Sequence, residues 1–167
     1  ADATVVDVAV ADPHDIEVAG SDGAAEYYPS AVSVAAGGGG GRAVGGGGRG
    51  QGEKDIGQYD KEDYVFGACA GAGIYRRDFF EQVGIFDEDF FIFAEDVDIN
   101  MRGQLQGFKC VYLPEAKVYH IGTATVGLYS DRYVYLCKRN DIFVLVRNYS
   151  LKMYFRYLWT ILKHQFN

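Results

Sequence analysis

Three acids stand together after an aromatic run, and they are the side chains of this chain best placed for acid–base chemistry. Glu95, Asp96 and Asp98 directly follow the sequence FFIFA. Acids at the start of a helix ordinarily satisfy backbone N–H groups and suit the helix dipole, so capping is the plain interpretation of any one of them. Three acids within four residues are more than capping requires. A carboxylate held against an apolar wall is also a suitable general base toward a hydroxyl group.

Other assignments of this cluster fail on spacing. Asp96, Asp98 and Asn100 match the first three ligand positions of an EF-hand calcium loop. Met101 then stands where glycine is required, and Gly107 stands where the bidentate glutamate belongs, so this assignment is rejected. A hydrolase triad has little support, because no G-x-S-x-G motif occurs and no base lies near the serines and cysteines in sequence.

His120 ends a second apolar segment, close to the small polar sequence GTAT. A lone histidine at the end of a strand is more often a core or rim residue than a metal ligand. It gains weight here only from the acids that precede it. The sequence therefore leaves both interpretations of His120 open.

The elements that position these residues are predicted from periodicity. A short helix over 76–83 is ended by Gly84, and a helix over 95–106 is ended by Gly107. We expect Val97, Met101 and Leu105 to form one buried stripe on the second helix, on which Asp98 and Arg102 can pair. Strands are predicted within 64–75, 109–114 and 116–122, with a break at Pro114 between the last two. A mostly helical region is predicted over 130–167, with a break near 148–150.

The organisation of the 167 residues follows composition. Residues 1–57 are predicted to be irregular and glycine-rich, and residues 37–52 form a flexible loop in which a G-x-G-x-x-G match is expected by chance. Residues 58–130 are expected to form an ordered α/β part, and residues 131–167 a helical region. Three widely spaced cysteines without C-x-x-C favour a reducing compartment, and no signal peptide is visible.

Charge separates the two ends of the chain. The net charge is −7, yet residues 1–30 contain seven acids and no Lys or Arg, whereas residues 131–167 contain seven Lys or Arg and two Asp. An acidic body argues against nucleic acid as a partner. The segment 151–167 carries an apolar face and is too short to span a bilayer, which needs about 20 residues. Two alternatives stay open for it: peripheral contact with a membrane, or packing on protein.

The motifs in this order resemble the catalytic domain of family 2 glycosyltransferases, in the rhamnosyltransferase-like branch. Across residues 58–149 the chain carries a series that matches the family pattern: Gly67-Ala68, Phe86-Asp87-Glu88, Glu95-Asp96-Val97-Asp98, Pro114-Glu115-Ala116, His120 and Arg139-Asn140. The order and spacing of several motifs make the resemblance specific. The family's amino-terminal nucleotide-binding half, with its D-x-D motif, has no counterpart before Tyr64, so the chain resembles the carboxy-terminal portion of such a domain.

The resemblance implies an α/β fold of the GT-A type, with a mixed sheet, flanking helices and further helices at the carboxy-terminal end, but incomplete. It implies transfer of a sugar, with inversion, from a nucleotide-sugar donor to a hydroxyl of a glycan or lipid-linked acceptor. This reaction would serve cell-surface polysaccharide or glycolipid synthesis at the cytoplasmic face of a membrane.

The resemblance also implies residue roles. Asp96 matches the catalytic base, Glu95 and Asp98 shape the acceptor site, and His120 matches a ligand of a divalent metal, Mg or Mn. Gly67 and Ala68 let the backbone approach the substrate closely. Arg139 is a candidate for phosphate contact.

Two alternatives remain beside an enzyme. One is a non-catalytic fragment or degenerate relative that binds a sugar or a protein. The other is an unrelated α/β binding domain with an acidic pocket, which does not account for the ordered motifs.

Overall fold

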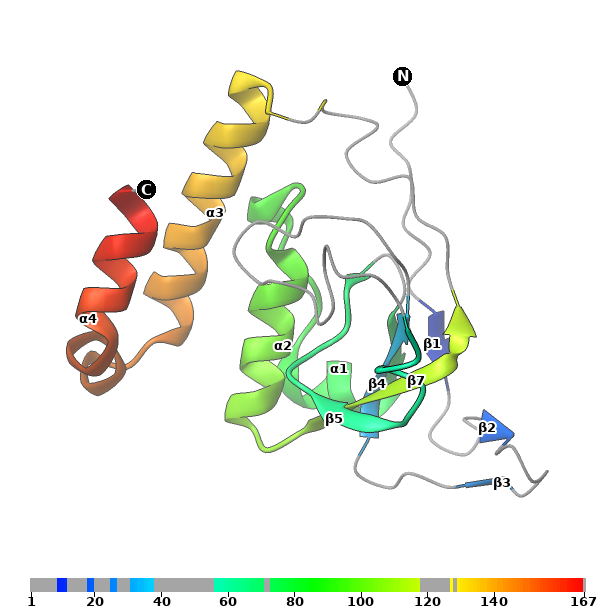
Figure 1. Cartoon of the computed structure of the whole chain (residues 1–167). Helices are drawn as coiled ribbons and strands as arrows, with labels where there is room; N and C mark the ends of the chain where they lie inside the picture. The colour runs from blue at the N-terminus through cyan, green and yellow to red at the C-terminus, as the bar shows by residue number, and fades with distance from the viewer. Residues whose placement is uncertain are drawn as a thin grey trace.

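The computed structural model describes residues 9–11, 18–19, 25–26, 31–37, 56–70, 73–117, 127 and 129–166. Figure 1 shows a small sheet with α1 and α2 beside it, and with α3 and α4 on the far side of α2. The elements in chain order are β1 (Ala9–Ala11), β2 (Val18–Ala19), β3 (Ala25–Glu26), β4 (Ala31–Gly37), β5 (Asp63–Val65), β6 (Gly73–Arg76), α1 (Arg77–Val83), the 3-10 helix η2 (Glu88–Phe90), α2 (Glu95–Leu105), β7 (Lys109–Lys117), α3 (Asp131–Asn148) and α4 (Leu151–Phe166).

The main sheet is mixed, which confirms the predicted α/β class. Its strand order is β1-β6-β4-β7-β5. Strands β1 and β6 are parallel, as are β4 and β7, whereas β4 pairs antiparallel with β6 and β5 pairs antiparallel with β7. A separate antiparallel pair joins β2 and β3.

The central strand β4 lies in the segment that the sequence predicted to be irregular. It pairs with β6 on one side and with β7 on the other. Its sequence AVSVAAG alternates small residues with Val32 and Val34, and β-branched residues favour strands. The prediction was therefore wrong for residues 31–37, because a general shortage of large apolar residues hid a short strand that has partners on both sides.

The predicted break at Pro114 is also wrong, because β7 continues through it from Lys109 to Lys117. Proline cannot donate a ladder hydrogen bond, so it is confined to bulges and to positions without a partner. Here the pairing of β7 with β5 covers only Cys110 to Tyr112, and the register with β4 shifts between Leu113 and Lys117. Pro114 thus sits in an irregular stretch of an otherwise continuous strand.

The predicted helix ends are confirmed, but the predicted buried stripe is not. Helix α1 ends at Gly84, whose φ of 87° is costly for any other residue type. Helix α2 ends at Leu105, two residues before Gly107. Leu105 is exposed, and Val97 and Met101 are only partly buried. The buried residues of α2 are instead Asp98, Ile99, Asn100 and Gly103.

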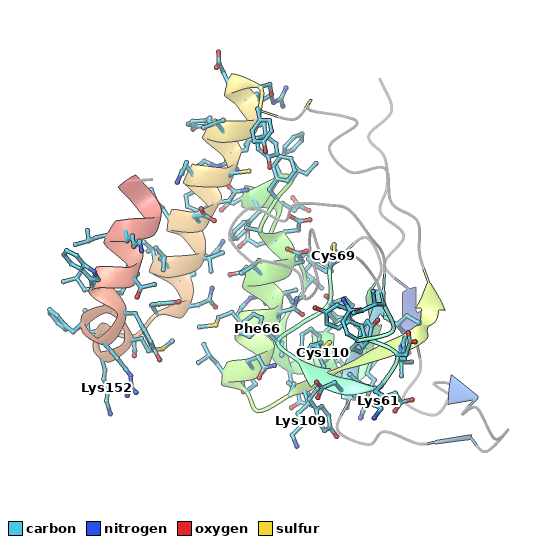
Figure 2. The ribbon with its side chains drawn as sticks, viewed as in Figure 1. Lys61, Phe66, Cys69, Lys109, Cys110 and Lys152 are labelled. Atoms are coloured by element: carbon cyan, nitrogen blue, oxygen red, sulfur yellow. The ribbon has the colours of Figure 1, made fainter. Side chains whose placement is uncertain are left out.

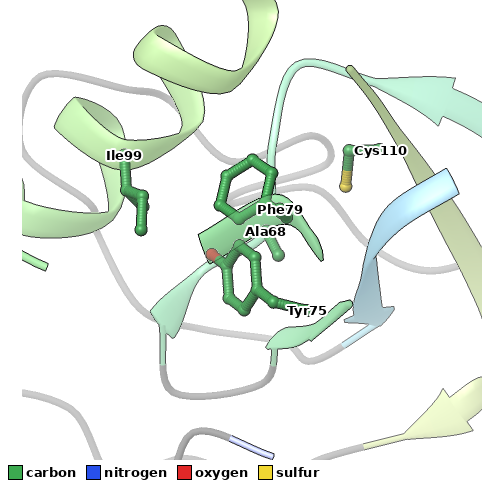
Figure 3. Packing of buried hydrophobic residues seen from close by; sticks show 5 residues of the cluster. All are labelled: Ala68, Tyr75, Phe79, Ile99 and Cys110. Atoms are coloured by element: carbon green, nitrogen blue, oxygen red, sulfur yellow. The ribbon is translucent and has the colours of Figure 1, made fainter. Parts of the chain in front are cut away.

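One apolar core lies where α1, α2 and the sheet meet. Figure 3 shows its members converging from five segments of the chain: Ala68, Tyr75, Phe79, Ile99 and Cys110. The rings of Tyr75 and Phe79 lie 5.4 Å apart between centroids, and Phe79 and Phe108 lie 5.3 Å apart at nearly right angles. Such ring pairs add directional packing to the burial itself. This core fixes α2 against the sheet.

The helical end of the chain is divided as predicted, with Tyr149 and Ser150 between α3 and α4. Ser130 caps α3, because its side chain accepts a hydrogen bond from the N–H of Tyr133. None of the helices within the described residues combines the length and apolar character needed to cross a bilayer.

Candidate functional site

The acidic cluster lies at the start of α2, after a turn with unusual backbone geometry. Phe91, Phe93 and Ala94 have φ values of 62°, 71° and 62°. Residues other than glycine rarely adopt such values, and each costs about 1 kcal/mol or more. Ala94 is the residue that caps α2, and it supplies no side-chain hydrogen bond. Contacts from elsewhere must therefore hold this turn in place.

Those contacts come from Arg139 and Asn140 on α3. The Asn140 amide nitrogen donates to the carbonyl oxygens of Phe90, Ile92 and Phe93 at 2.9, 2.8 and 2.6 Å. Arg139 donates from one terminal nitrogen to the carbonyl oxygens of Asp89 and Phe90, both at 2.9 Å. Its Nε donates to the Asn140 side-chain oxygen at 2.9 Å.

These two side chains form a clamp on residues 89–93, the turn that leads into the acids. Asn140 is 0% exposed. In the structure Arg139 binds backbone carbonyls of this turn, and its predicted contact with a phosphate stays a prediction.

Glu95 is the first residue of α2 and is largely buried. Its Oε2 atom is buried without a hydrogen-bond partner among the described residues. Burial raises the pKa of Glu95 from 4.5 to about 7, and the neighbouring charge of Asp96 adds to the shift. A carboxyl group with a pKa near neutrality can hold a proton or release it at ordinary pH.

Asp96 is held by two backbone groups. Its Oδ2 accepts a hydrogen bond from the N–H of Ala70 at 3.2 Å, and its Oδ1 accepts one from the N–H of Val97 at 2.8 Å. Each carboxylate oxygen keeps a second lone pair for another donor. The side chain is partly exposed, so it is both oriented by the protein and accessible.

Asp96 is also the first member of a polar stripe along α2. Asn100 donates from its amide to the carbonyl of Ala68 at 2.7 Å, and Gln104 donates to the carbonyl of Phe66 at 2.8 Å. Residues 96, 100 and 104 are spaced i, i+4 and i+8, so they share one face of the helix. Through these three hydrogen bonds the face of α2 holds the segment 66–70, which lies between β5 and β6 and runs antiparallel to the helix.

Gly67 is needed for this close approach. A Cβ atom at Gly67 would overlap the Asn100 side chain. Ala68 is buried in the core, and its carbonyl accepts the Asn100 hydrogen bond. The structure thus gives both residues a packing role against α2. Their predicted contact with a substrate stays a prediction.

Asp98 faces the opposite way, toward α3. It is 1% exposed. It accepts hydrogen bonds from Arg102 at 2.9 Å, which confirms the predicted pair, and from the Asn148 amide at 2.8 Å. Arg102 also donates to the carbonyls of Val83 and Ile85. Asp98 therefore braces α2 against α3 and the turn after α1, a position that supports the site without reaching its surface.

A cavity of about 240 Å³ lies beside Asp98, and it is lined by Ile85, Phe86, Asp87, Asp98, Arg102 and Arg147. Its four charged residues are already paired, because Arg147 binds Asp87 and Arg102 binds Asp98. The backbone N–H of Asp89 and the Arg147 guanidinium lower the pKa of Asp87. Glu95 and Asp96 do not line this cavity, so these two acids lie apart from it, unlike Asp98.

His120 lies outside the described residues, so its predicted metal role is untested. Within the described part of the chain, no group of three His, Cys, Asp or Glu side chains is arranged to hold a metal ion.

The positioning role of four amides was not predicted from the sequence: Asn100, Gln104, Asn140 and Asn148. A signal for the first two was present, since they continue the spacing of Asp96 at four-residue intervals. On α3 the same interval joins Asn140, the buried Val144 and Asn148. An Asn or Gln four or eight residues after a functional residue of a helix therefore indicates that one face of the helix forms buried hydrogen bonds.

Part of this chain is similar to characterised enzymes. Over 57 residues it is 42% identical to N-acetylglucosaminyl-diphospho-decaprenol L-rhamnosyltransferase of Mycobacterium tuberculosis, in the strains CDC 1551 / Oshkosh and ATCC 25618 / H37Rv. The similarity covers 34% of this chain and only 18% of the length of each relative.

The similarity is thus local. No family model matches the chain. No solved structure matches it either.

Proposed function

We propose that this chain forms the acceptor side of an inverting glycosyltransferase. The reaction would move a sugar from a nucleotide-sugar donor to a hydroxyl of a glycan or lipid-linked acceptor, in the synthesis of cell-surface polysaccharide or glycolipid. The observation that carries the proposal is Asp96, which is oriented by the Ala70 N–H and accessible at the start of α2. The local similarity to a rhamnosyltransferase that acts on a lipid-linked sugar supports the same assignment.

In the proposed step Asp96 acts as general base. Its carboxylate accepts the proton of the acceptor hydroxyl while that oxygen forms a bond to the anomeric carbon of the donor. The bond from that carbon to the diphosphate breaks on the opposite face, and the diphosphate leaves with the electron pair, so the configuration inverts.

Glu95 and Asp98 have supporting roles in this proposal. Glu95 lies next to the base and holds a proton over part of the neutral pH range, so its carboxyl group can donate a hydrogen bond to the acceptor. Asp98 holds α2 in place through Arg102 and Asn148.

The proposal includes a divalent metal, Mg or Mn, for which His120 is the one ligand that the resemblance implies. Such a metal supplies positive charge that neutralises a leaving diphosphate. Calorimetric titration of a nucleoside diphosphate, with and without Mn²⁺, tests it. We expect metal-dependent binding to weaken in His120→Ala, and metal dependence equal to that of the wild type would leave His120 without this role.

The catalytic assignment is tested by sugar transfer. The full chain is incubated with radiolabelled nucleoside diphosphate sugars, L-rhamnose among them, and an N-acetylglucosaminyl-diphospho-polyprenol acceptor. Asp96→Asn keeps the shape and loses the base, so we expect transfer to fall by about 10²–10⁴-fold with donor binding unchanged. The matched control is Glu81→Gln on the exposed face of α1, which should transfer like the wild type.

The possible results separate the two functional classes. Transfer by Asp96→Asn at the wild-type rate would overturn the assignment of the base. Binding of nucleotide sugar by the wild type without any transfer would favour the alternative, a sugar-binding module.

A further inference from the structure

Helix α4 is the least buried helix of the structure, and its apolar side chains face solvent. None of its described side chains, residues 151–163, is buried. Trp159 is 81% exposed and Phe155 is 77% exposed. Figure 1 shows α4 at the edge of the molecule, with α3 between it and the sheet.

The exposed apolar residues form one stripe. They are Leu151, Phe155, Leu158, Trp159 and Leu162. Their spacing of i, i+4, i+7, i+8 and i+11 places them on one side of a helix. The more covered side of α4 carries Met153, Tyr154 and Ile161, so the apolar stripe is not the face that packs on the protein.

Positive charge follows one flank of this stripe. Lys152, Arg156 and Lys163 are exposed and each comes directly after a residue of the stripe, so the three lie about 100° further around the helix. The described residues of α4 include no Asp or Glu. Figure 2 shows Lys152 pointing away from the body of the molecule.

We propose that α4 binds in the plane of a membrane surface that contains anionic lipids. The apolar stripe enters the boundary between headgroups and acyl chains, and the three basic side chains stay at the level of the phosphates. With 16 residues α4 is about 24 Å long, so it lies along the surface and does not span the bilayer.

The basic side chains beside the apolar stripe of α4 favour a lipid surface over a protein as its partner. Lysine and acidic residues are depleted in protein–protein interfaces, whereas basic residues beside an apolar stripe are typical of interfacial helices. Tryptophan also prefers the membrane–water interface, where its ring is partly apolar and its N–H stays near polar groups. This inference stands on α4 alone and holds whether or not the chain transfers sugar.

Trp159 reports on this surface directly, because it is the one tryptophan of the sequence. The full chain is titrated with vesicles of phosphatidylcholine, or of phosphatidylcholine mixed with phosphatidylglycerol. We expect a blue shift of Trp159 emission with the mixed vesicles, and quenching when the lipids carry bromine on their acyl chains. Binding to phosphatidylcholine alone should be far weaker.

A matched pair of triple variants tests the basic flank. Lys152→Gln, Arg156→Gln and Lys163→Gln together should weaken binding to the mixed vesicles on the order of a hundredfold. The control triple is Lys61→Gln, Lys109→Gln and Arg132→Gln, which changes the net charge equally at exposed positions outside α4. In Figure 2 Lys109, at the start of β7, and Lys61, just before β5, lie on the side of the molecule that carries the sheet, away from α4. Equal loss in both triples would overturn the proposal, because net charge alone would then explain binding.

Phe155→Ser tests insertion of the apolar stripe. We expect it to weaken vesicle binding at least several-fold, with an unchanged circular dichroism spectrum. Wild-type binding by this variant, no response of Trp159 to mixed vesicles, or a blue shift that depends on protein concentration without lipid would each overturn the proposal. The last result would instead indicate that two copies of α4 pack together.

Discussion

Helices α3 and α4 follow one another in the chain, yet α3 buries two amide side chains while α4 leaves its largest apolar side chains exposed. The buried face of α3 carries two amides, Asn140 and Asn148, beside four apolar or aromatic residues: Tyr133, Leu136, Cys137 and Val144. On α4 the stripe of leucines and aromatic residues faces solvent. The difference follows from bonding partners: the amides of α3 meet backbone carbonyls and Asp98, whereas the described residues offer the stripe of α4 no apolar surface to cover it.

This contrast shows what decides burial near the candidate site. A buried amide is favourable only when its donors and acceptors are satisfied. The Asn140 amide nitrogen lies within hydrogen-bond distance of three carbonyls of a turn whose residues adopt costly φ values, and Arg139 donates to one of the three. Asn140 and Asn148 of α3 therefore hold the start of α2 in position, whereas the apolar stripe of α4 faces solvent.

The largest effect is expected at Asn140. Asn140→Ala would leave the carbonyls of Ile92 and Phe93 without their side-chain donor, whereas the carbonyl of Phe90 keeps Arg139. Unsatisfied buried groups cost about 1–3 kcal/mol each. We expect a loss of about 3 kcal/mol in the free energy of unfolding, measured by urea denaturation. A loss below about 1 kcal/mol would mean that the amide stripe of α3 does not hold the turn. Val146→Ala, at an exposed position of the same helix, is the control.

An intermediate effect with a defined pH dependence is expected at Glu95, whose buried Oε2 has no hydrogen-bond partner among the described residues. Its pKa is about 7 when folded and 4.5 otherwise, so the folded chain binds more protons between these values. The contribution of Glu95 to stability is therefore most favourable below pH 4.5 and is lost as pH rises from 4.5 through 7. Glu95→Gln removes this loss and should stabilise the chain by about 1–3 kcal/mol at pH 8 but not at pH 4.

The Glu95 prediction is checked by unfolding the wild type and Glu95→Gln across this pH range. Two identical pH profiles would show that Glu95 has a partner that ionises with it or that it is well hydrated. Glu88→Gln, at an exposed position of η2, is the matched control and should leave the profile unchanged.

The sequence predicted those features that depend on local chemistry. Gly84 and Gly107 marked helix ends because positive φ favours glycine, and the i, i+4 spacing predicted the Asp98–Arg102 pair. The prediction failed where the structure of a segment depends on contacts with residues far along the chain. Strand β4 depends on two neighbours far along the chain, and the buried face of α2 depends on which carbonyls its amides reach, so hydrophobicity selected Leu105 in place of Asn100.

The smallest effect on stability is expected at Phe155, and it completes the comparison. Because this ring is 77% exposed, Phe155→Ala should change the free energy of unfolding by less than about 0.5 kcal/mol, despite the loss of a large apolar side chain. Urea denaturation in the absence of lipid measures it, with Asn140→Ala as the positive control. A loss above about 2 kcal/mol would show that the stripe of α4 packs on this chain in solution, which would remove the surface on which the proposed lipid contact depends. A neutral result joined to weaker vesicle binding would show that the apolar residues of α4 serve binding, just as the polar residues of α3 serve folding.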